Sequence, residues 1–98
     1  MKVFISQPMR GRTDEEILAE REAALIKASR ELRQPVTPVD SFFAEAPVEA
    51  KPLWYLGKSL MLLAEADVVY FVKGWQEARG CRVERLCAEQ YQIPILEE

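Results

Sequence analysis

Short apolar runs alternate along this chain with longer segments whose apolar residues recur at helical spacing. Residues 2–5 form an alternating apolar run that ends in a polar turn, which is typical of a strand. Residues 67–72 form a near-continuous apolar run, which suits a strand buried on both faces of a parallel sheet. Residues 93–96 predict a last strand, and residues 35–39 predict an edge strand because their two prolines cannot donate to an interior ladder.

Three segments between these runs predict helices. Residues 13–33 begin with Thr13-Asp14-Glu15-Glu16, a capping box, and continue with apolar residues at helical spacing. Residues 52–66 begin with a proline, which is tolerated at the first position of a helix. Residues 81–91 predict a third helix. Its inward residues are expected to be Val83, Leu86 and Cys87.

The predicted order of elements is therefore β-α-β-α-β-α-β. This order indicates an α/β fold: a small flavodoxin-like or Rossmann-like three-layer sandwich of about four parallel strands, with helices on both faces. We expect residues 1–98 to form a single domain. Ligands of such sheets bind outside the carboxyl ends of the strands, near the point where strand order reverses. The loops at residues 6–12, 40–51 and 73–80 are therefore the predicted ligand loops.

Composition narrows the classes of partner. The net charge is −3, from 13 basic and 16 acidic residues that are mixed along the chain, so there is no basic stripe for a nucleic acid. No segment approaches the roughly 20 apolar residues that cross a bilayer, and the first apolar run is too short for a signal peptide. We expect a soluble cytoplasmic protein without a membrane partner. A domain of 98 residues has a small core, which favours a homo-oligomer.

The chain contains no histidine and two cysteines, Cys81 and Cys87. Six positions apart in a predicted helix, the cysteines lie on different faces and are too far apart for a disulfide. They also lack the spacing of a zinc site. We therefore expect two reduced thiols, no metal and no cofactor.

The first predicted loop is rich in groups that recognise polar ligands. Its hydroxyl, amide, glycine and arginines suit phosphate pairing, although a turn with solvated arginines is the structural alternative. It lacks the glycine spacing and the Lys-Ser/Thr ending of a P-loop. The candidate binding residues here are Ser6, Gln7, Arg10 and Gly11.

The third predicted loop leads into a helix with a glutamate near its start. Gly80 is the predicted N-cap, which leaves N–H groups facing a ligand. Glu84 falls in the first turn or just beyond it, where the helix dipole favours its ionised form. An ionised carboxylate there can attack a sugar anomeric carbon or hold a sugar hydroxyl, or serve only as a helix-dipole partner. Trp75 suits stacking on a nucleobase and packing over the sheet edge equally well.

Five short motifs, spread over nearly the whole chain, resemble a known family. They are Phe-Ile-Ser-Gln-Pro-Met-Arg-Gly at 4–11, Leu-Gly-Lys-Ser-Leu at 56–60, Ala-Asp-Val-Val-Tyr-Phe at 66–71, Gly-Trp at 74–75 and Arg-Gly-Cys-Arg-Val-Glu at 79–84. Together they resemble a family of small, uncharacterised bacterial and phage proteins. That family is placed with the nucleoside 2-deoxyribosyltransferase-like proteins.

The resemblance implies a nucleoside or nucleotide N-glycosidase or deoxyribosyltransferase. Gly80 and Glu84 match the family's Gly-x-x-x-Glu arrangement, which implies Glu84 as the nucleophile. The early loop of that group contacts sugar or phosphate, which implies the same role for its matching residues here: Ser6, Gln7, Arg10 and Gly11. On this hypothesis Arg10 and Arg79 hold a phosphate and Trp75 stacks on the base of a small nucleoside or nucleotide.

One position departs from the enzymes of that group. They carry an aspartate on the helix before the third strand, where this chain has Ser59. Asp40, Glu77 or a partner subunit are the candidates for the missing acid. The alternative hypothesis is a sensor module that binds a nucleotide-derived ligand without chemistry, and a third is an interaction protein with no small ligand.

Overall fold

A computed structural model describes residues 1–40 and 46–98 of the chain; residues 41–45, part of the second predicted ligand loop, lie outside the described residues. Its centre is one four-stranded sheet in the order β2-β1-β3-β4, in which every neighbouring pair is parallel. The strands are β1 (Lys2–Ser6), β2 (Thr37–Pro38), β3 (Val68–Phe71) and β4 (Ile95–Glu97). The predicted edge position of β2 and the predicted order of elements are confirmed.

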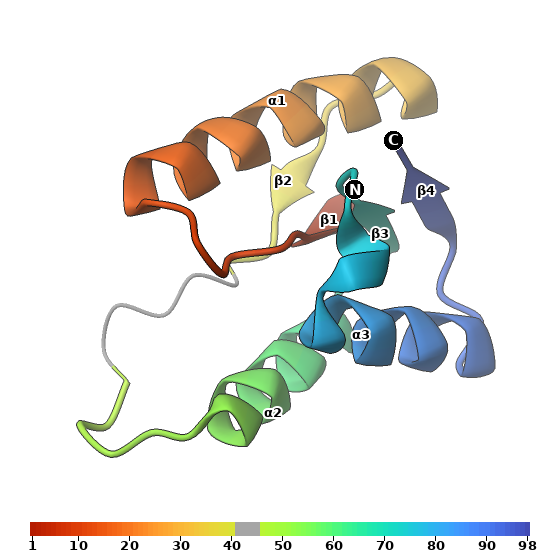
Figure 1. The fold of residues 1–98 in the computed structure, drawn as a ribbon. Helices are drawn as coiled ribbons and strands as arrows, with labels where there is room; N and C mark the ends of the chain where they lie inside the picture. Colours follow the sequence, from red (N-terminus) through yellow and green to blue (C-terminus); the bar gives the residue numbers. More distant parts are fainter. Residues whose placement is uncertain (41–45) are drawn as a thin grey trace.

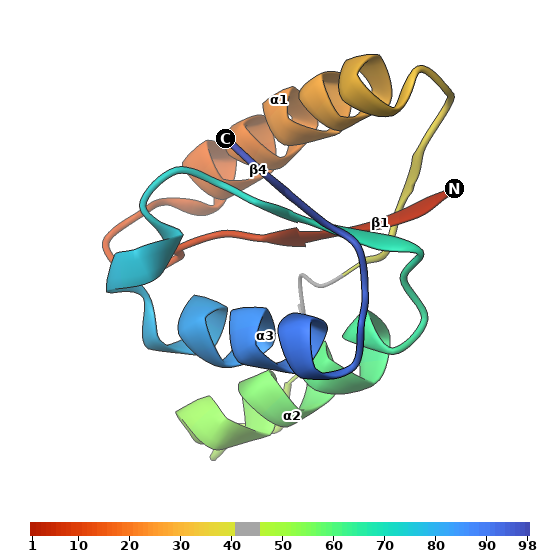
Figure 2. The same ribbon diagram turned by 90° about the vertical axis from the view of Figure 1, so that its right-hand side faces the viewer.

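Helices cover both faces of this sheet, as predicted. Helix α1 (Asp14–Leu32) lies on one face, and α2 (Pro52–Leu63) and α3 (Arg79–Gln90) lie on the other (Figures 1 and 2). A short 3-10 turn, η1 (Trp75–Glu77), precedes α3. No helix in the described ranges combines the length and the apolar character that crossing a membrane requires.

Alternate residues of the central strands supply two separate apolar cores. On the α1 face the buried cluster includes Val3, Ile5, Ala24, Ala28, Val68 and Tyr70. On the opposite face it includes Phe4, Leu63, Val69, Phe71 and Ala88. Because successive residues of a strand point to opposite faces, β1 and β3 contribute to both cores, which explains their near-continuous apolar sequences.

The capping box predicted at the start of α1 is present. The Thr13 hydroxyl accepts a hydrogen bond from the Glu16 amide at 3.1 Å, and the Glu16 carboxylate accepts one from the Thr13 amide at 3.1 Å. Two amides that a helix start leaves unpaired are thereby satisfied. The cap ends the loop that follows β1 at a defined point.

Helix α3 differs from its prediction in two respects. It begins at Arg79, with Ala78 as the N-cap, so Gly80 is its second residue and not the predicted cap. Of the three residues predicted to face inward, Leu86 is 57% exposed, whereas Val83 is partly buried and Cys87 packs against the core of the α3 face. The residues that α3 buries against the sheet are Cys81, Glu84 and Ala88. Glu84 can be buried on this face because Ser6, at the end of β1, supplies a polar partner for its carboxyl group.

The strand order places the ends of β1 and β3 side by side. From that edge the chain leaves β1 toward α1 on one face and leaves β3 toward η1 and α3 on the other. Figure 2 shows the loop after β1, η1 and the starts of α2 and α3 gathered at the same edge of the sheet. This is the reversal of strand order at which open α/β sheets bind ligands.

Candidate functional site

A cleft of about 1440 Å³ occupies the carboxyl edge of the sheet. Its walls are the loop after β1, the first half of α2, η1 and the start of α3. Six of the eight predicted site residues are among its lining: Gln7, Arg10, Gly11, Arg79, Gly80 and Glu84. Ser6 and Trp75 are not in the lining, but Ser6 is buried and donates a hydrogen bond to Glu84, which lines the cleft.

Glu84 is a buried carboxyl group joined to the end of β1. Its residue is 7% exposed, and the Ser6 hydroxyl donates a hydrogen bond to its Oε1 at 2.8 Å. Burial raises the pKa of Glu84 to about 7, and the hydrogen bond from Ser6 offsets only part of that rise. Burial thus favours the neutral form of Glu84, against the ionised form that the helix dipole is expected to favour. As the sixth residue of α3, it lies beyond the turn where the helix dipole acts strongly, so desolvation dominates.

The thiol of Cys81 lies next to Ser6 and Glu84. Cys81 is 3% exposed, and burial raises its pKa to about 11, against a smaller opposite effect of hydrogen bonding to Ser6. The thiol is thus protonated at neutral pH and is a poor nucleophile. Both cysteines are free, and among residues 1–40 and 46–98 no three metal-binding side chains are grouped to hold an ion.

The start of α3 presents unpaired amides beside this carboxyl group. The first N–H groups of a helix have no acceptor within the helix, and no side chain caps them here. Arg79, Gly80 and Cys81, which carry these amides, all line the cleft. The partial positive charge of a helix start attracts an anionic group of a ligand.

Two arginines of the cleft are available for an anion. Arg10 and Arg79 line it, and within the described part of the chain neither makes an ion pair or a side-chain hydrogen bond. The other arginines of the lining are engaged: Arg12 pairs with Glu20 at 3.3 Å, and Arg82 donates to a backbone carbonyl at 2.9 Å. Two free guanidinium groups and a helix start together suit a phosphate.

Trp75 packs against the edge of the sheet. Its indole nitrogen donates to the Glu97 carboxylate at 3.2 Å, and its ring packs against Phe71 with centroids 5.3 Å apart. The Arg85 guanidinium lies 4.8 Å from the ring centroid. The structure therefore favours the second of the two interpretations, packing over the sheet edge, because these contacts hold the indole against β3 and β4 and outside the cleft lining.

The structure also shows which candidates for a second acid lie in the cleft. Ser59 and Glu77 line the cleft, whereas Asp40 does not, and the charge of Asp40 acts on the buried Arg21. Glu16 lines the cleft as well, but its carboxylate caps α1. Glu77 is thus the lining carboxylate, among the described residues, that is neither buried nor used in a cap.

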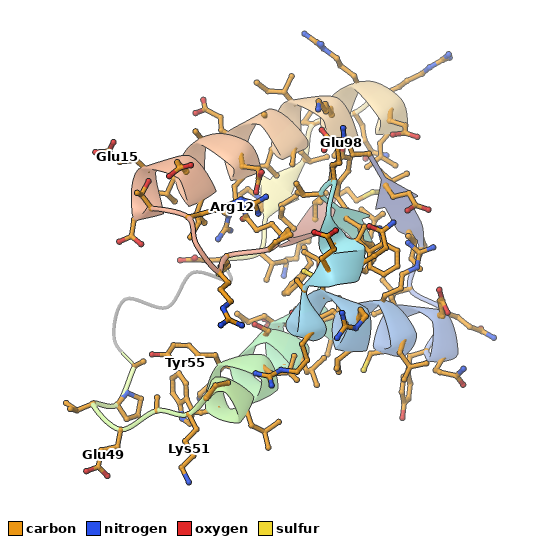
Figure 3. The ribbon with its side chains drawn as sticks, in the orientation of Figure 1. Arg12, Glu15, Glu49, Lys51, Tyr55 and Glu98 are labelled. Atoms are coloured by element: carbon orange, nitrogen blue, oxygen red, sulfur yellow. The ribbon has the colours of Figure 1, made fainter. Side chains whose placement is uncertain are left out.

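Glu20 is a functional candidate that the sequence did not indicate. Its carboxylate accepts a hydrogen bond from Gln7 Nε2 at 3.0 Å and pairs with Arg12 Nη1 at 3.3 Å. The guanidinium of Arg12 also donates to the Pro8 carbonyl. Figure 3 shows Arg12 on the side of the loop that faces α1. Glu20 thereby ties both ends of the Arg10 loop to α1, a contact between elements that helical spacing does not reveal.

We expect Glu20→Ala to loosen this loop. A hydrogen bond to a charged group contributes roughly 1.5–3 kcal/mol, so the loss of even one of these contacts should raise local opening by about tenfold or more. The measurement is the rate of tryptic cleavage after Arg10 and Arg12 in the native protein. Glu22→Ala, which removes an exposed carboxylate from the same helix, is the matched control. Equal cleavage rates in the two variants would show that Glu20 does not hold the loop.

These features define an α/β fold of the 2-deoxyribosyltransferase type with a cleft at the carboxyl edge of its sheet. A solved structure of a 2-deoxyribosyltransferase from the psychrotolerant bacterium Bacillus psychrosaccharolyticus matches it with a TM-score of 0.63 and 14% sequence identity, over 99% of this chain and 71% of that chain. At this identity the match concerns the fold. Residues 1–97 match the family described as Domain of unknown function (DUF4406), and the chain belongs to that family. A search of curated proteins found no match.

Proposed function

We propose that this protein cleaves the N-glycosidic bond of a nucleoside or nucleotide, as an N-glycosidase or a deoxyribosyltransferase. The observation that carries the proposal is the buried Glu84 carboxyl, whose Oε1 accepts a hydrogen bond from the Ser6 hydroxyl at 2.8 Å. It lies in a cleft whose Arg10 and Arg79 form no ion pair with any of the described residues. A carboxyl group fixed in a cleft beside an anion-binding helix start suits attack on the sugar of a phosphorylated substrate. The fold shared with a 2-deoxyribosyltransferase supports the same substrate class.

The phosphate of a 5′-nucleotide is the group that Arg10 and Arg79 suit. They supply guanidinium groups from the loop after β1 and from the start of α3, and the amides at the start of α3 supply further donors. Gly11 has a φ of 80°, a conformation that glycine adopts without strain, and it lets the chain turn directly after Arg10. This arrangement favours a nucleoside monophosphate over the free nucleoside.

The reaction proceeds through the ionised form of Glu84. Ser6 donates to Oε1, and the second carboxylate oxygen forms a bond to C1′ as the C1′–N bond breaks. The electron pair of that bond goes to the departing base, which takes a proton from a water molecule in the cleft. The hydroxide that remains attacks C1′ and releases the Glu84 carboxylate. A second base in place of water gives transfer.

A sensor without catalysis is the second candidate, and two observations favour it. Ser59 stands on the cleft where the resembling enzymes have an aspartate, and a pKa of about 7 leaves much of Glu84 protonated at neutral pH. Both properties reduce a nucleophile's reactivity without weakening the binding of an anion.

Incubation with the four 2′-deoxynucleosides and their 5′-monophosphates tests the proposal, with free base measured by chromatography. We expect base release from at least one monophosphate, and at least tenfold slower release from the matching nucleoside, which lacks the charged group for Arg10 and Arg79. A rise in melting temperature with a monophosphate but no free base would favour the sensor. If no base is released and no monophosphate changes the melting temperature, both candidates are contradicted.

A further inference from the structure

Helix α2 is strongly apolar, yet much of its surface is uncovered. Eight of its twelve residues, all within the described range, are apolar, and of these only Leu63 is buried. Leu53 is 75% exposed and Met61 is 66% exposed. In both ribbon views the start of α2 lies farther from the sheet than its end, so its first half has little to pack against (Figures 1 and 2). Large exposed apolar side chains gathered on one helix are typical of an interaction surface.

The exposed side of α2 carries a ridge with a glycine at its centre. Leu53, Gly57 and Met61 follow one another at intervals of four residues, so they lie in one row along the helix surface. Inside a helix, glycine costs about 1 kcal/mol relative to alanine. Beyond its own helix, no described atom lies within 4 Å of the position that a Cβ of Gly57 would occupy, so no such contact requires glycine there. The glycine makes a notch between two large side chains, into which a second helix can approach closely.

The charges at the two ends of this ridge are opposite. Lys51, the N-cap of α2, lies six residues before Gly57, and Glu65 lies eight residues after it. Both side chains are exposed, and neither forms an ion pair with any of the described residues. Figure 3 shows Lys51 pointing away from the rest of the molecule. The helix dipole adds positive charge at the start of α2 and negative charge at its end, so the surface is complementary to an antiparallel copy of itself.

The other charged residue of α2 does not oppose this pairing. The ammonium of Lys58 lies 5.7 Å from the centroid of the Trp54 ring, which is one turn nearer the start of the helix. A two-fold axis at Gly57 therefore leaves the two Lys58 charges on opposite sides of the helix crossing.

We propose that a second copy of this chain packs on this surface, with α2 antiparallel to α2 about a two-fold axis at Gly57. Leu53 of each chain then lies against Met61 of the other, and Lys51 lies near Glu65. Two helices about 18 Å long bury less than the roughly 800 Å² per partner of a standard interface, so the dimer dissociates in the micromolar range. Leu53 also lines the cleft, so the second copy supports the cleft wall that α2 provides. The pairing does not depend on the proposed function.

Sedimentation equilibrium of the full chain tests the pairing. We expect the molar mass to approach twice the 11.3 kDa of one chain at about 100 μM and to fall toward that of one chain on dilution. Gly57→Gln fills the notch, so it should raise the dissociation constant of the dimer by at least tenfold. Glutamine favours a helix more than glycine does, so the melting temperature of the diluted monomer should stay the same or rise. Leu18→Gln replaces a 51% exposed leucine of α1 and is the matched control, which should leave the dissociation constant unchanged.

Charge reversal tests the antiparallel direction. Lys51→Glu places two like charges together at each end of the interface and should weaken the dimer severalfold at low salt, and adding Glu65→Lys should restore it. Failure of the second change to restore association would contradict the antiparallel arrangement.

Two other outcomes would overturn the proposal. One is the mass of a single chain at every concentration up to about 1 mM, which is also the result expected if α2 binds a partner of another kind. The other is a dimer that neither Gly57→Gln nor Met61→Gln weakens, because the two copies would then meet through a different surface.

Discussion

Glu84→Gln is expected to make the protein more stable than the native form at pH 8 and equally stable at pH 4. The side chain is 7% exposed, and burial raises its pKa to about 7 from the ordinary 4.5. Glutamine has nearly the same shape, can accept the Ser6 hydrogen bond, and carries no charge to bury. The variant therefore removes a cost that the native protein bears only when Glu84 is ionised.

The sign of this effect follows from proton binding. In the unfolded chain Glu84 loses its proton near pH 4.5, whereas in the folded protein it keeps the proton until about pH 7. The folded state thus binds more protons between these values, and the free energy of unfolding falls as pH rises through that window. Above pH 7 the loss is complete and amounts to roughly 3 kcal/mol, since one pKa unit corresponds to about 1.4 kcal/mol.

Thermal unfolding at several pH values measures the effect. For a domain of this size, about 3 kcal/mol corresponds to a difference in Tm on the order of 10 °C at pH 8. Glu89→Gln is the matched control, because Glu89 is an exposed carboxylate on the same helix, paired with Arg85 at 2.8 Å. Its difference from the native protein should vary little with pH. A Glu84→Gln difference that is the same at pH 4 and pH 8 would show that Glu84 ionises normally.

The second large effect is on catalysis. If Glu84 is the nucleophile, Glu84→Gln should lower the rate of base release by about 10³-fold or more, because an amide cannot form the glycosyl ester. In the native protein, kcat should rise with pH and level off above about pH 7, where the Glu84 carboxylate is ionised. The measurement is the initial rate of base release from the fastest monophosphate between pH 5 and 9.

The same two variants separate catalysis from stability. Glu84→Gln is expected to be more stable and inactive at pH 8, whereas Glu89→Gln should keep native activity. A variant that loses activity because it unfolds would lose stability as well, whereas Glu84→Gln is expected to gain stability as it loses activity. Activity that survives in Glu84→Gln, or a rate that does not change between pH 5 and 8, would remove Glu84 from the role of nucleophile.

The sequence predicted the fold closely because each element has a strong local signal. Two apolar runs became the paired central strands β1 and β3, and the Thr13–Glu16 capping box marked the start of α1. The ligand edge followed from the order of elements, since parallel strands end together. Six of eight predicted site residues line the cleft there for the same reason, since they lie in the loop after β1 and in the first half of α3, the helix that follows β3.

Two features of the candidate site had no local signal. Trp75 follows β3 directly, yet its indole is held by Glu97, which is 22 residues away in the chain. Gln7 and Arg12 are tied by Glu20, whose position on α1 is that of an ordinary surface residue of an amphipathic helix. Apolar spacing describes which side of an element faces a core, and it says little about which polar groups meet at its ends.

The sequence by itself thus determined the order of strands and helices, the parallel sheet and the edge where its loops converge, because these depend on periodicity and on short connections. Only the tertiary structure decided the burial and the protonation state of Glu84. Its inward direction depends on how α3 packs against the sheet, and its pKa of about 7 depends on burial beside Ser6, which is 78 residues away in the chain. Desolvation depends on everything packed around a group, so it is known only once the chain is folded.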